Sequence, residues 1–330
     1  MPESLLGTPA APPRLVGIAR LAAASPLLAA KSQVEYFELE CRSILNRCSS
    51  PRMPFPWTIN PYRGCEFGCQ YCYARYTHEF MEMRDSRLFE QKIYAKARAA
   101  EILAQELRHR EGAIAIGTGT DPYQPAERRY GVTRGILGVF AGERGRALSI
   151  TTKSNLIERD IDLLRRIARA NVLHIHVTVT TTDAALAGKL EPRAPRPDLR
   201  LAAVERLAGA GLSVGVNLNP ILPGITDSVA SLDAVARAAA ARGARFLCGG
   251  ILFLMPAAQK QFFPFLDRQF PELAPRYRAR FAQNPYLRGE YAAALRDRVA
   301  RIRGRYGLAS SPPDYVPPEA GCEPQMALFG

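Results

Sequence analysis

Along residues 53–256, short hydrophobic runs typical of strands alternate with segments in which apolar residues recur at helical spacing. Short runs rich in β-branched residues predict strands at 57–60, 113–118, 147–152, 173–180, 212–218 and 245–252. Between them, apolar residues recur at helical spacing and predict helices at 97–109, 133–141, 156–170, 198–210 and 227–241. Strands that alternate with helices predict an α/β fold with a parallel sheet. Both an open doubly wound sheet and a partial (βα)6 TIM-type barrel satisfy this pattern.

The rest of the chain divides into three further segments. Residues 1–52 are predicted to form an N-terminal extension that is loosely ordered to about residue 33. A signal peptide is not expected there, because Arg20 and Pro26 interrupt the apolar stretch. Residues 257–308 are predicted to be basic helices, and residues 309–330 a flexible tail. The last helix carries one apolar face, made of Tyr291, Leu295, Val299, Ile302 and Tyr306.

The net charge of the chain and its lack of long apolar runs indicate which partners are expected. The chain has 44 Lys and Arg against 31 Asp and Glu, a formal net charge of +13. Residues 257–306 hold eleven of the basic and four of the acidic residues, so this region supplies 11 − 4 = +7 of the total. The overall excess favours a polyanionic partner such as nucleic acid, and the C-terminal helices present either a phosphate-contacting surface or an ordinary solvated face. No apolar run reaches the roughly 18 residues of a membrane span, so no membrane association is expected.

Polar and glycine residues gather after four of the predicted strands, at 117–121, 152–155, 178–183 and 217–219. In parallel α/β folds the carboxyl ends of the strands form the functional face. Such residues also serve to turn the chain and cap the next helix. Four groups on one expected face nevertheless favour a site.

Three of the seven cysteines, Cys65, Cys69 and Cys72, lie within eight residues in a Cys-x3-Cys-x2-Cys pattern. Clustered thiols in an odd total predict a metal site in a reducing compartment, and hence a cytoplasmic protein. Three thiolates can bind three irons of a 4Fe–4S cluster and leave the fourth iron open for chemistry. The competing interpretation is a Cys3His zinc site completed by His78, which would make the chain a zinc-stabilised nucleic-acid-binding module.

The cysteine loop resembles the cluster-binding motif of the radical S-adenosylmethionine (SAM) superfamily, and the βα succession matches the partial barrel of that superfamily. More narrowly, the chain resembles uncharacterised bacterial relatives within the spore-photoproduct-lyase-like branch, and not the lyase itself. The segments that carry this narrower resemblance are 43–46, 59–65, 119–127, 152–154 and 220–224.

The resemblance implies an enzyme that uses a 4Fe–4S cluster to cleave SAM to a 5′-deoxyadenosyl radical. It implies that Cys65, Cys69 and Cys72 are the iron ligands and that a flavodoxin or ferredoxin supplies the electron. The residues expected to contact the cofactor are Tyr71, Gly119, Thr120, Asp121, Lys153, Ser154, Thr178, Thr180, Asn217 and Asn219.

One position departs from the lyase pattern. Where the lyase carries a cysteine that returns a hydrogen atom to the product, this sequence has Thr118. Tyr71 and Tyr73, beside the cysteines, are therefore the expected catalytic hydrogen donors, with Cys248 a weaker candidate. This departure argues against thymine-dimer reversal as the reaction.

The C-terminal peptide Gln325–Phe329 is similar to the short motifs by which bacterial DNA-repair proteins bind the sliding clamp. The alternative is a hydrophobic terminus that folds back onto its own barrel. With the basic helices, this peptide favours DNA repair or modification as the function. The same radical chemistry on a peptide or small molecule remains the alternative, followed by the zinc-stabilised module.

Overall fold

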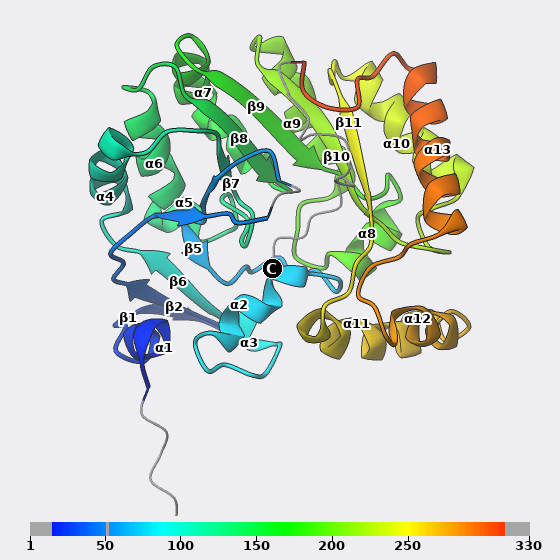
Figure 1. Cartoon of the computed structure of the whole chain (residues 1–330), viewed down its shortest axis with the longest axis horizontal. Coiled ribbons are helices and arrows are strands. Elements are labelled where there is room, and N and C mark those ends of the chain that lie inside the picture. Colours follow the sequence, from blue (N-terminus) through cyan, green and yellow to red (C-terminus); the bar gives the residue numbers. More distant parts are fainter. Residues whose placement is uncertain (1–14, 51–52, 314–330) are drawn as a thin grey trace, which may run out of the picture.

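The computed structural model describes residues 15–50 and 53–313 and is built around a curved, mostly parallel sheet (Figure 1). Within the described residues this sheet has the order β11-β10-β9-β8-β7-β4-β3. Its parallel strands are β4 (Trp57–Ile59), β7 (Ile114–Ile116), β8 (Ala147–Thr152), β9 (Val172–Thr178), β10 (Ser213–Ile221) and β11 (Leu247–Ile251). Each coincides with a predicted strand. Because β3 (Leu45–Arg47) pairs only with β4 here, the described strands form a partial and not a closed barrel.

Helices connect these strands and lie along the outside of the sheet (Figure 1). The connecting helices are α4 (Ala99–Glu106), α5 (Glu127–Tyr130), α6 (Val132–Phe140), α7 (Ile161–Ala168), α8 (Ala184–Leu190), α9 (Pro197–Gly209) and α10 (Val229–Ala241). Local chemistry sets several of their starts: the Asp183 and Ser228 side chains accept hydrogen bonds from amides of α8 and α10, respectively. The start of α8 therefore coincides with the end of the polar group predicted at 178–183, whereas α10 begins only at Val229, beyond the group at 217–219.

A second sheet, which the sequence pattern did not predict, packs beside the first. Its order is β1-β2-β6-β5, with bounds Leu27–Lys31, Val34–Leu39, Lys92–Lys96 and Tyr62–Arg63. Short helices accompany it: α1 (Gly17–Ala23), α2 (Tyr76–Glu79) and α3 (Leu88–Gln91). The expectation of loose order to residue 33 therefore fails from residue 17 onward. The reason is long-range pairing, because β2 lies parallel to β6, more than fifty residues later in the chain.

The C-terminal region is helical, as predicted, with α11 (Pro256–Gln269), α12 (Ala274–Phe281) and α13 (Glu290–Arg305). The predicted apolar face of α13 is present, since its Leu295, Val299 and Ile302 are buried. Two of its arginines pack the helix against the α10 region: Arg298 donates to the Asp227 carbonyl oxygen at 2.7 Å, and Arg305 donates to Asp233 at 2.6 Å. Part of the positive charge of α13 is therefore structural.

The chain does not leave the barrel at residue 309 as expected. Ala309 forms a bridge with Phe246, and Ser310–Pro312 contribute to the wall of the main cavity. The predicted clamp-binding peptide, Gln325–Phe329, lies outside the described residues. Among the described helices, none is long and apolar enough to cross a membrane.

Gly215 in β10 provides a test of how tightly the barrel packs. A Cβ at this position would lie 2.2 Å from Cδ2 of the fully buried Phe246 ring. We expect Gly215→Ala to lower the free energy of unfolding by about 1–3 kcal/mol, because the ring must move within a close-packed core. Chemical denaturation measures this loss. The control is Gly188→Ala, on α8, where nothing lies within 4 Å of the added Cβ. Equal stability of both variants would contradict the packing argument.

Candidate active site

A single cavity of about 940 Å³ lies inside the curve of the larger sheet. Its wall is formed by residues of β7 to β11, by the cysteine loop and by α13. Cys65, Cys69, Cys72 and Lys153 all line it. The structure thus brings the predicted cluster loop and the carboxyl ends of several strands to the wall of one open cavity.

Gly64 sets the course of the cysteine loop. Its φ of +79° suits glycine, and a Cβ there would lie 2.7 Å from the Lys92 carbonyl oxygen and 2.8 Å from that of Phe89. Its own carbonyl oxygen accepts hydrogen bonds from Thr120 Oγ1 at 2.6 Å and Gln124 Nε2 at 3.0 Å. Thr120, predicted to contact the cofactor, therefore holds the loop with its hydroxyl group.

Arg75 binds the backbone of the cysteine loop. This side chain is buried, and its Nη2 donates to the Cys69 carbonyl oxygen at 3.0 Å. The same nitrogen lies 2.6 Å from Glu90 Oε2, while Nη1 donates to the Ser86 carbonyl oxygen at 2.7 Å. A buried arginine with these partners fixes the backbone between the second and third cysteines.

The three thiols suit an iron–sulfur cluster. Cys65 and Cys69 are each only 8% exposed, and Cys72 is half-buried. Burial raises the pKa of all three thiols, that of Cys69 to about 12, so without metal they stay protonated at neutral pH. Binding of a metal deprotonates such thiols outright. Soft sulfur donors, held by a glycine-bearing loop on one cavity wall, match the ligand preference of iron–sulfur centres.

Asp121 joins the end of β7 to the end of β8. Its Oδ1 accepts hydrogen bonds from Thr152 Oγ1 at 2.7 Å and the Tyr123 amide at 2.9 Å, and its Oδ2 accepts from the Lys153 amide at 2.7 Å. Asp121 lines the cavity as predicted, but both carboxylate oxygens have protein donors. In this structure the carboxylate fixes the backbone of Lys153.

Lys153 presents an ammonium group to the cavity. Its Nζ lies 5.8 Å from the centroid of the Tyr71 ring, and no described residue forms an ion pair with it. Burial acts to lower the pKa of Lys153, but the neighbouring Cys69 and Glu191 outweigh it and raise the pKa overall. The ammonium therefore stays charged and suits a carboxylate ligand.

Three other predicted contact residues serve the scaffold. The Gly119 amide donates to Asn60 Oδ1 at 2.6 Å. Ser154 Oγ accepts an amide from the turn that follows it at 3.2 Å, and Thr180 Oγ1 donates to Glu191 Oε1 at 3.3 Å. Ser154 and Thr180 do not belong to the cavity wall. The Ser154 hydroxyl caps the turn that follows it, and the Thr180 hydroxyl forms a buried hydrogen bond.

A row of side chains crosses the wall opposite these loops. Thr178, Asn217 and Cys248 are direct neighbours in register on β9, β10 and β11, and all line the cavity, as does Asn219. Cys248 Sγ lies 4.0 Å from His176 Nδ1, and burial raises the pKa of this thiol to about 12. The strand ends thus bring together Thr178, Asn217 and Asn219 as expected.

The pair Glu191 and Arg200 was missed by the sequence analysis. Both side chains are buried, with Arg200 Nη1 2.5 Å from Glu191 Oε2, and the Tyr71 hydroxyl donates to Glu191 Oε1. Burial acts to raise the pKa of Glu191, but Arg200 and Lys153 lower it overall, so the carboxylate is charged. One signal was available: Arg200 precedes the buried Val204 of α9 by four residues and therefore falls on the apolar face of that helix.

Tyr73 lies on the other side of the third cysteine. Its hydroxyl donates to the carbonyl oxygen of Thr118. Thr118 Oγ1 in turn is 3.2 Å from Asn60 Nδ2. Tyr71, Tyr73 and Thr118 all line the cavity, and the hydroxyl groups of both tyrosines bind protein acceptors.

The structure does not form the alternative zinc site. His78 is 1% exposed, its Nε2 lies 3.0 Å from the Lys92 carbonyl oxygen, and it is not part of the cavity wall with the cysteines. Across residues 15–50 and 53–313, no three His, Cys, Asp or Glu side chains are grouped to bind one metal ion. His78 is a packed core residue, in edge contact with Phe89 and Tyr94.

The chain is similar to proteins from distant organisms. An uncharacterized protein of Mycobacterium tuberculosis is 37% identical over 305 residues, which cover 90% of this chain and 88% of that protein. An uncharacterized protein of Methanocaldococcus jannaschii is 26% identical over 196 residues, 59% of this chain and 71% of the relative. In fold, the chain is similar to spore photoproduct lyase complexed with dinucleoside spore photoproduct, with a TM-score of 0.60 at 15% identity over 83% of this chain and 81% of the lyase.

Residues 59–234 match the family model described as the radical SAM superfamily. The match begins at the last residue of β4, includes the three cysteines and extends into α10. It therefore covers the cysteine loop and most of the parallel strands that enclose the cavity. The chain belongs to the radical SAM superfamily and is an enzyme.

Proposed function

We propose that this enzyme acts on a base of DNA, in repair or modification. The observation that carries the proposal is the composition of the cavity wall, which holds the three thiols and Lys153 together with Arg296 and Arg303 of α13. A volume of about 940 Å³ lies at the upper end of the roughly 300–1,000 Å³ typical of small-molecule sites. Such a space suits a cofactor and the reacting part of a larger substrate together.

Cys65, Cys69 and Cys72 would hold the 4Fe–4S cluster, and Lys153 would bind the carboxylate of SAM. When both are bound, the cluster and SAM would supply a 5′-deoxyadenosyl radical. Thr178, Asn217 and Asn219 offer hydroxyl and amide groups to the polar parts of the nucleoside. The buried Glu191 and Arg200 position the Tyr71 ring against which Lys153 lies. These residues orient the reactants and exclude water.

Tyr73 and Tyr71 are the residues that we assign to the return of a hydrogen atom to the substrate radical. The Tyr73 hydroxyl reaches the Thr118 carbonyl, so its ring borders the place of the missing cysteine. A Thr118 hydroxyl is a far poorer hydrogen donor than a thiol. In Tyr73→Phe, SAM cleavage that continues without product would be the signature of this role.

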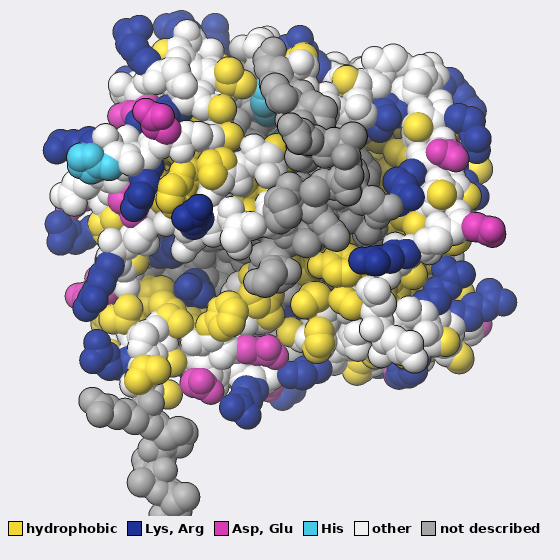
Figure 2. All heavy atoms as spheres, viewed as in Figure 1, with side chains coloured by type: hydrophobic (Ala, Val, Ile, Leu, Met, Phe, Trp, Pro, Cys, Tyr) yellow, Lys and Arg dark blue, Asp and Glu magenta, His cyan; other side chains and the backbone are white. Residues whose placement is uncertain are grey.

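The charge distribution supports nucleic acid as the substrate class. Lys and Arg side chains surround the face shown in Figure 2, where acidic side chains are sparse. Arg298 and Arg305 bind the α10 region, whereas Arg296 and Arg303 of α13 line the cavity together with Asp297. A structural neighbour, the lyase, was solved with a dinucleoside. An enzyme that reacts with a base in DNA must bring that base out of the stack and into its pocket.

Cys69→Ala tests the assignment of the cluster ligands. We expect this variant to lose the cluster absorbance and to form no 5′-deoxyadenosine after anaerobic reconstitution with dithionite and SAM, since the remaining thiols cannot complete the three-iron attachment. Iron analysis and chromatography of the products measure both effects. The control is Cys48→Ala, because Cys48 does not line the cavity. A normal cluster in Cys69→Ala would remove this cysteine from the site.

Lys153→Met tests the proposed SAM contact. Loss of the charge-assisted interaction should weaken SAM binding by about 1–3 kcal/mol while the cluster content is unchanged. Equilibrium binding to the reconstituted protein gives this difference. Lys189→Met, which removes an exposed ammonium on α8, is the matched control. If both variants bind SAM as the unchanged enzyme does, Lys153 has no part in the site.

Salt-dependent DNA binding tests the substrate class. We expect Arg296→Gln and Arg303→Gln to weaken binding of a DNA oligonucleotide, each lowering the slope of log K against log[salt] by about 1 as a phosphate contact is lost. Fluorescence anisotropy at several salt concentrations measures the slope. Arg166→Gln, at an exposed position of α7 outside the cavity wall, should leave it unchanged. DNA binding that is insensitive to salt would contradict the proposal and favour a peptide or small-molecule substrate.

A further inference from the structure

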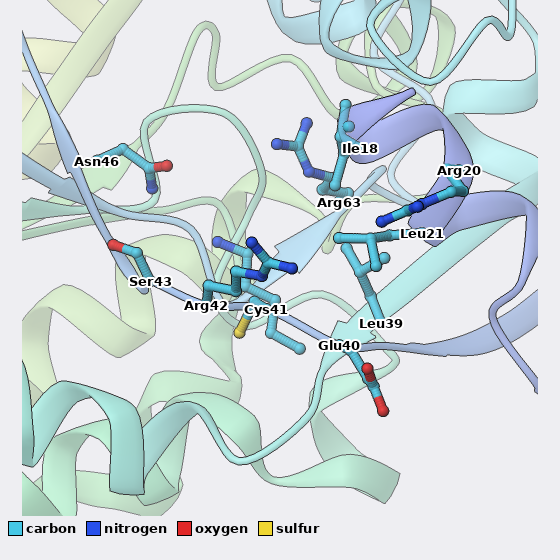
Figure 3. A pocket seen from close by; sticks show the side chains of 12 residues that line it. Ile18, Arg20, Leu21, Leu39, Glu40, Cys41, Arg42, Ser43, Asn46 and Arg63 are labelled. Carbon is cyan, nitrogen blue, oxygen red and sulfur yellow. The ribbon is translucent and has the colours of Figure 1, made fainter. Parts of the chain in front are cut away.

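A second pocket, of about 290 Å³, lies among α1, the segment after β2, and the strands β5 and β6 (Figure 3). Its wall shares no residue with the main cavity. Four basic side chains line it, from separate segments of the chain: Arg20, Arg42, Arg63 and Lys96. Glu40 is the single acidic residue in the wall, and its carboxylate is directed away from the arginines (Figure 3). The pocket therefore has a net positive charge.

Lys96 is the most deeply placed of these cations. It is 7% exposed, and among the described residues nothing forms a hydrogen bond or an ion pair with its ammonium group. Burial, together with the positive charge of Arg63, lowers the pKa of Lys96 to about 8. Cys41 and Glu106 act in the opposite direction and raise the pKa of Lys96, but the Glu106 carboxylate already accepts hydrogen bonds from the amides of Ile44 at 3.0 Å and Leu45 at 2.9 Å.

Arg63 is also short of partners. Its Nε is buried and has no hydrogen-bond partner, and Nη1 has only a long contact of 3.5 Å to the Thr77 carbonyl oxygen. Arg20 and Arg42 are exposed and form no ion pair with any described residue. A buried cation without a partner costs free energy, which a bound anion would recover.

We propose that this pocket binds a phosphate group. A phosphate offers several acceptor oxygens in different directions, which suits donors that approach from four segments, and guanidinium groups bind such oxygens in pairs. The apolar side chains of Ile18, Leu21 and Leu39 also line the pocket and can cover the group that the phosphate esterifies. The phosphate belongs either to a small phosphorylated molecule or to a nucleic acid backbone.

The position of the pocket links it to the cluster loop. Arg63 immediately precedes Gly64 and Cys65, and Thr77, its carbonyl partner, follows Cys72 by five residues. A phosphate bound to Arg63 would therefore lie next to the residues that begin and follow this loop, in a pocket that shares no wall residue with the main cavity. The inference depends on the geometry of this pocket and not on the proposed DNA substrate.

Calorimetric titration of the full-length, reconstituted protein with inorganic phosphate tests the proposal. We expect saturable binding that weakens about tenfold or more in Arg42→Gln and in Lys96→Met, because each removes one charge-assisted contact. Arg42 is exposed, so its variant keeps the fold even if the Lys96 variant does not. Arg47→Gln, five residues away and outside the pocket, should bind like the unchanged protein. No saturable binding, or unchanged binding in Arg42→Gln, would overturn the proposal.

A DNA oligonucleotide titrated against the same variants distinguishes the two sources of phosphate. A backbone phosphate predicts weaker oligonucleotide binding in Arg42→Gln and a salt slope lowered by about 1. If the natural ligand is a small phosphorylated molecule, Arg42→Gln should bind the oligonucleotide as the unchanged protein does and should still show the weakened binding of inorganic phosphate. Neither measurement involves SAM cleavage or the α13 arginines, so the failure of this site and that of the proposed function are distinguishable.

Discussion

The carbonyl group of Gly64 is the contact on which the arrangement of the site depends. Two donors from the turn after β7, Thr120 and Gln124, bind this one oxygen, and the positive φ of Gly64 directs the following cysteines into the cavity. Asp121 in the same turn binds the backbone of Lys153. One short turn therefore sets the position of the thiol loop and of the cation opposite it, and neither depends on a flexible surface loop.

The sequence was sufficient to predict the parallel strands and their helices, because burial on both faces produces short apolar runs and each helix has its own periodicity. It did not predict the second sheet. The strands of that sheet are brief, and β2 pairs with β6 across a long stretch of intervening chain that contains the cysteine loop. The pattern of hydrophobic and polar residues within a short segment does not indicate which distant strand it pairs with. The order of residues 17–31 follows from it, since β1 is held only by β2 within the described chain.

The parts of the candidate site that lie within single short segments of the sequence could be predicted. The cysteine spacing indicated the loop, and the polar residues after the strands indicated Lys153, Thr178, Asn217 and Asn219. The same reasoning also selected Ser154 and Thr180, since a residue that caps a turn cannot be told from one that faces a ligand without coordinates. Glu191 and Arg200 were missed because their partnership with Tyr71 joins residues about 120 positions apart.

The partial closure of the barrel has a consequence for how such an enzyme can diverge. The thiols and Lys153 come from the first half of the chain, whereas α13 and the segment after it reach the cavity from the other edge of the sheet. Under the proposed function, α13 contacts the substrate while the three cysteines and Lys153 serve the cofactors, so these two sets of residues lie far apart in sequence although they border one cavity. A substitution in α13 can then alter the choice of substrate without changing the cysteine loop or Lys153.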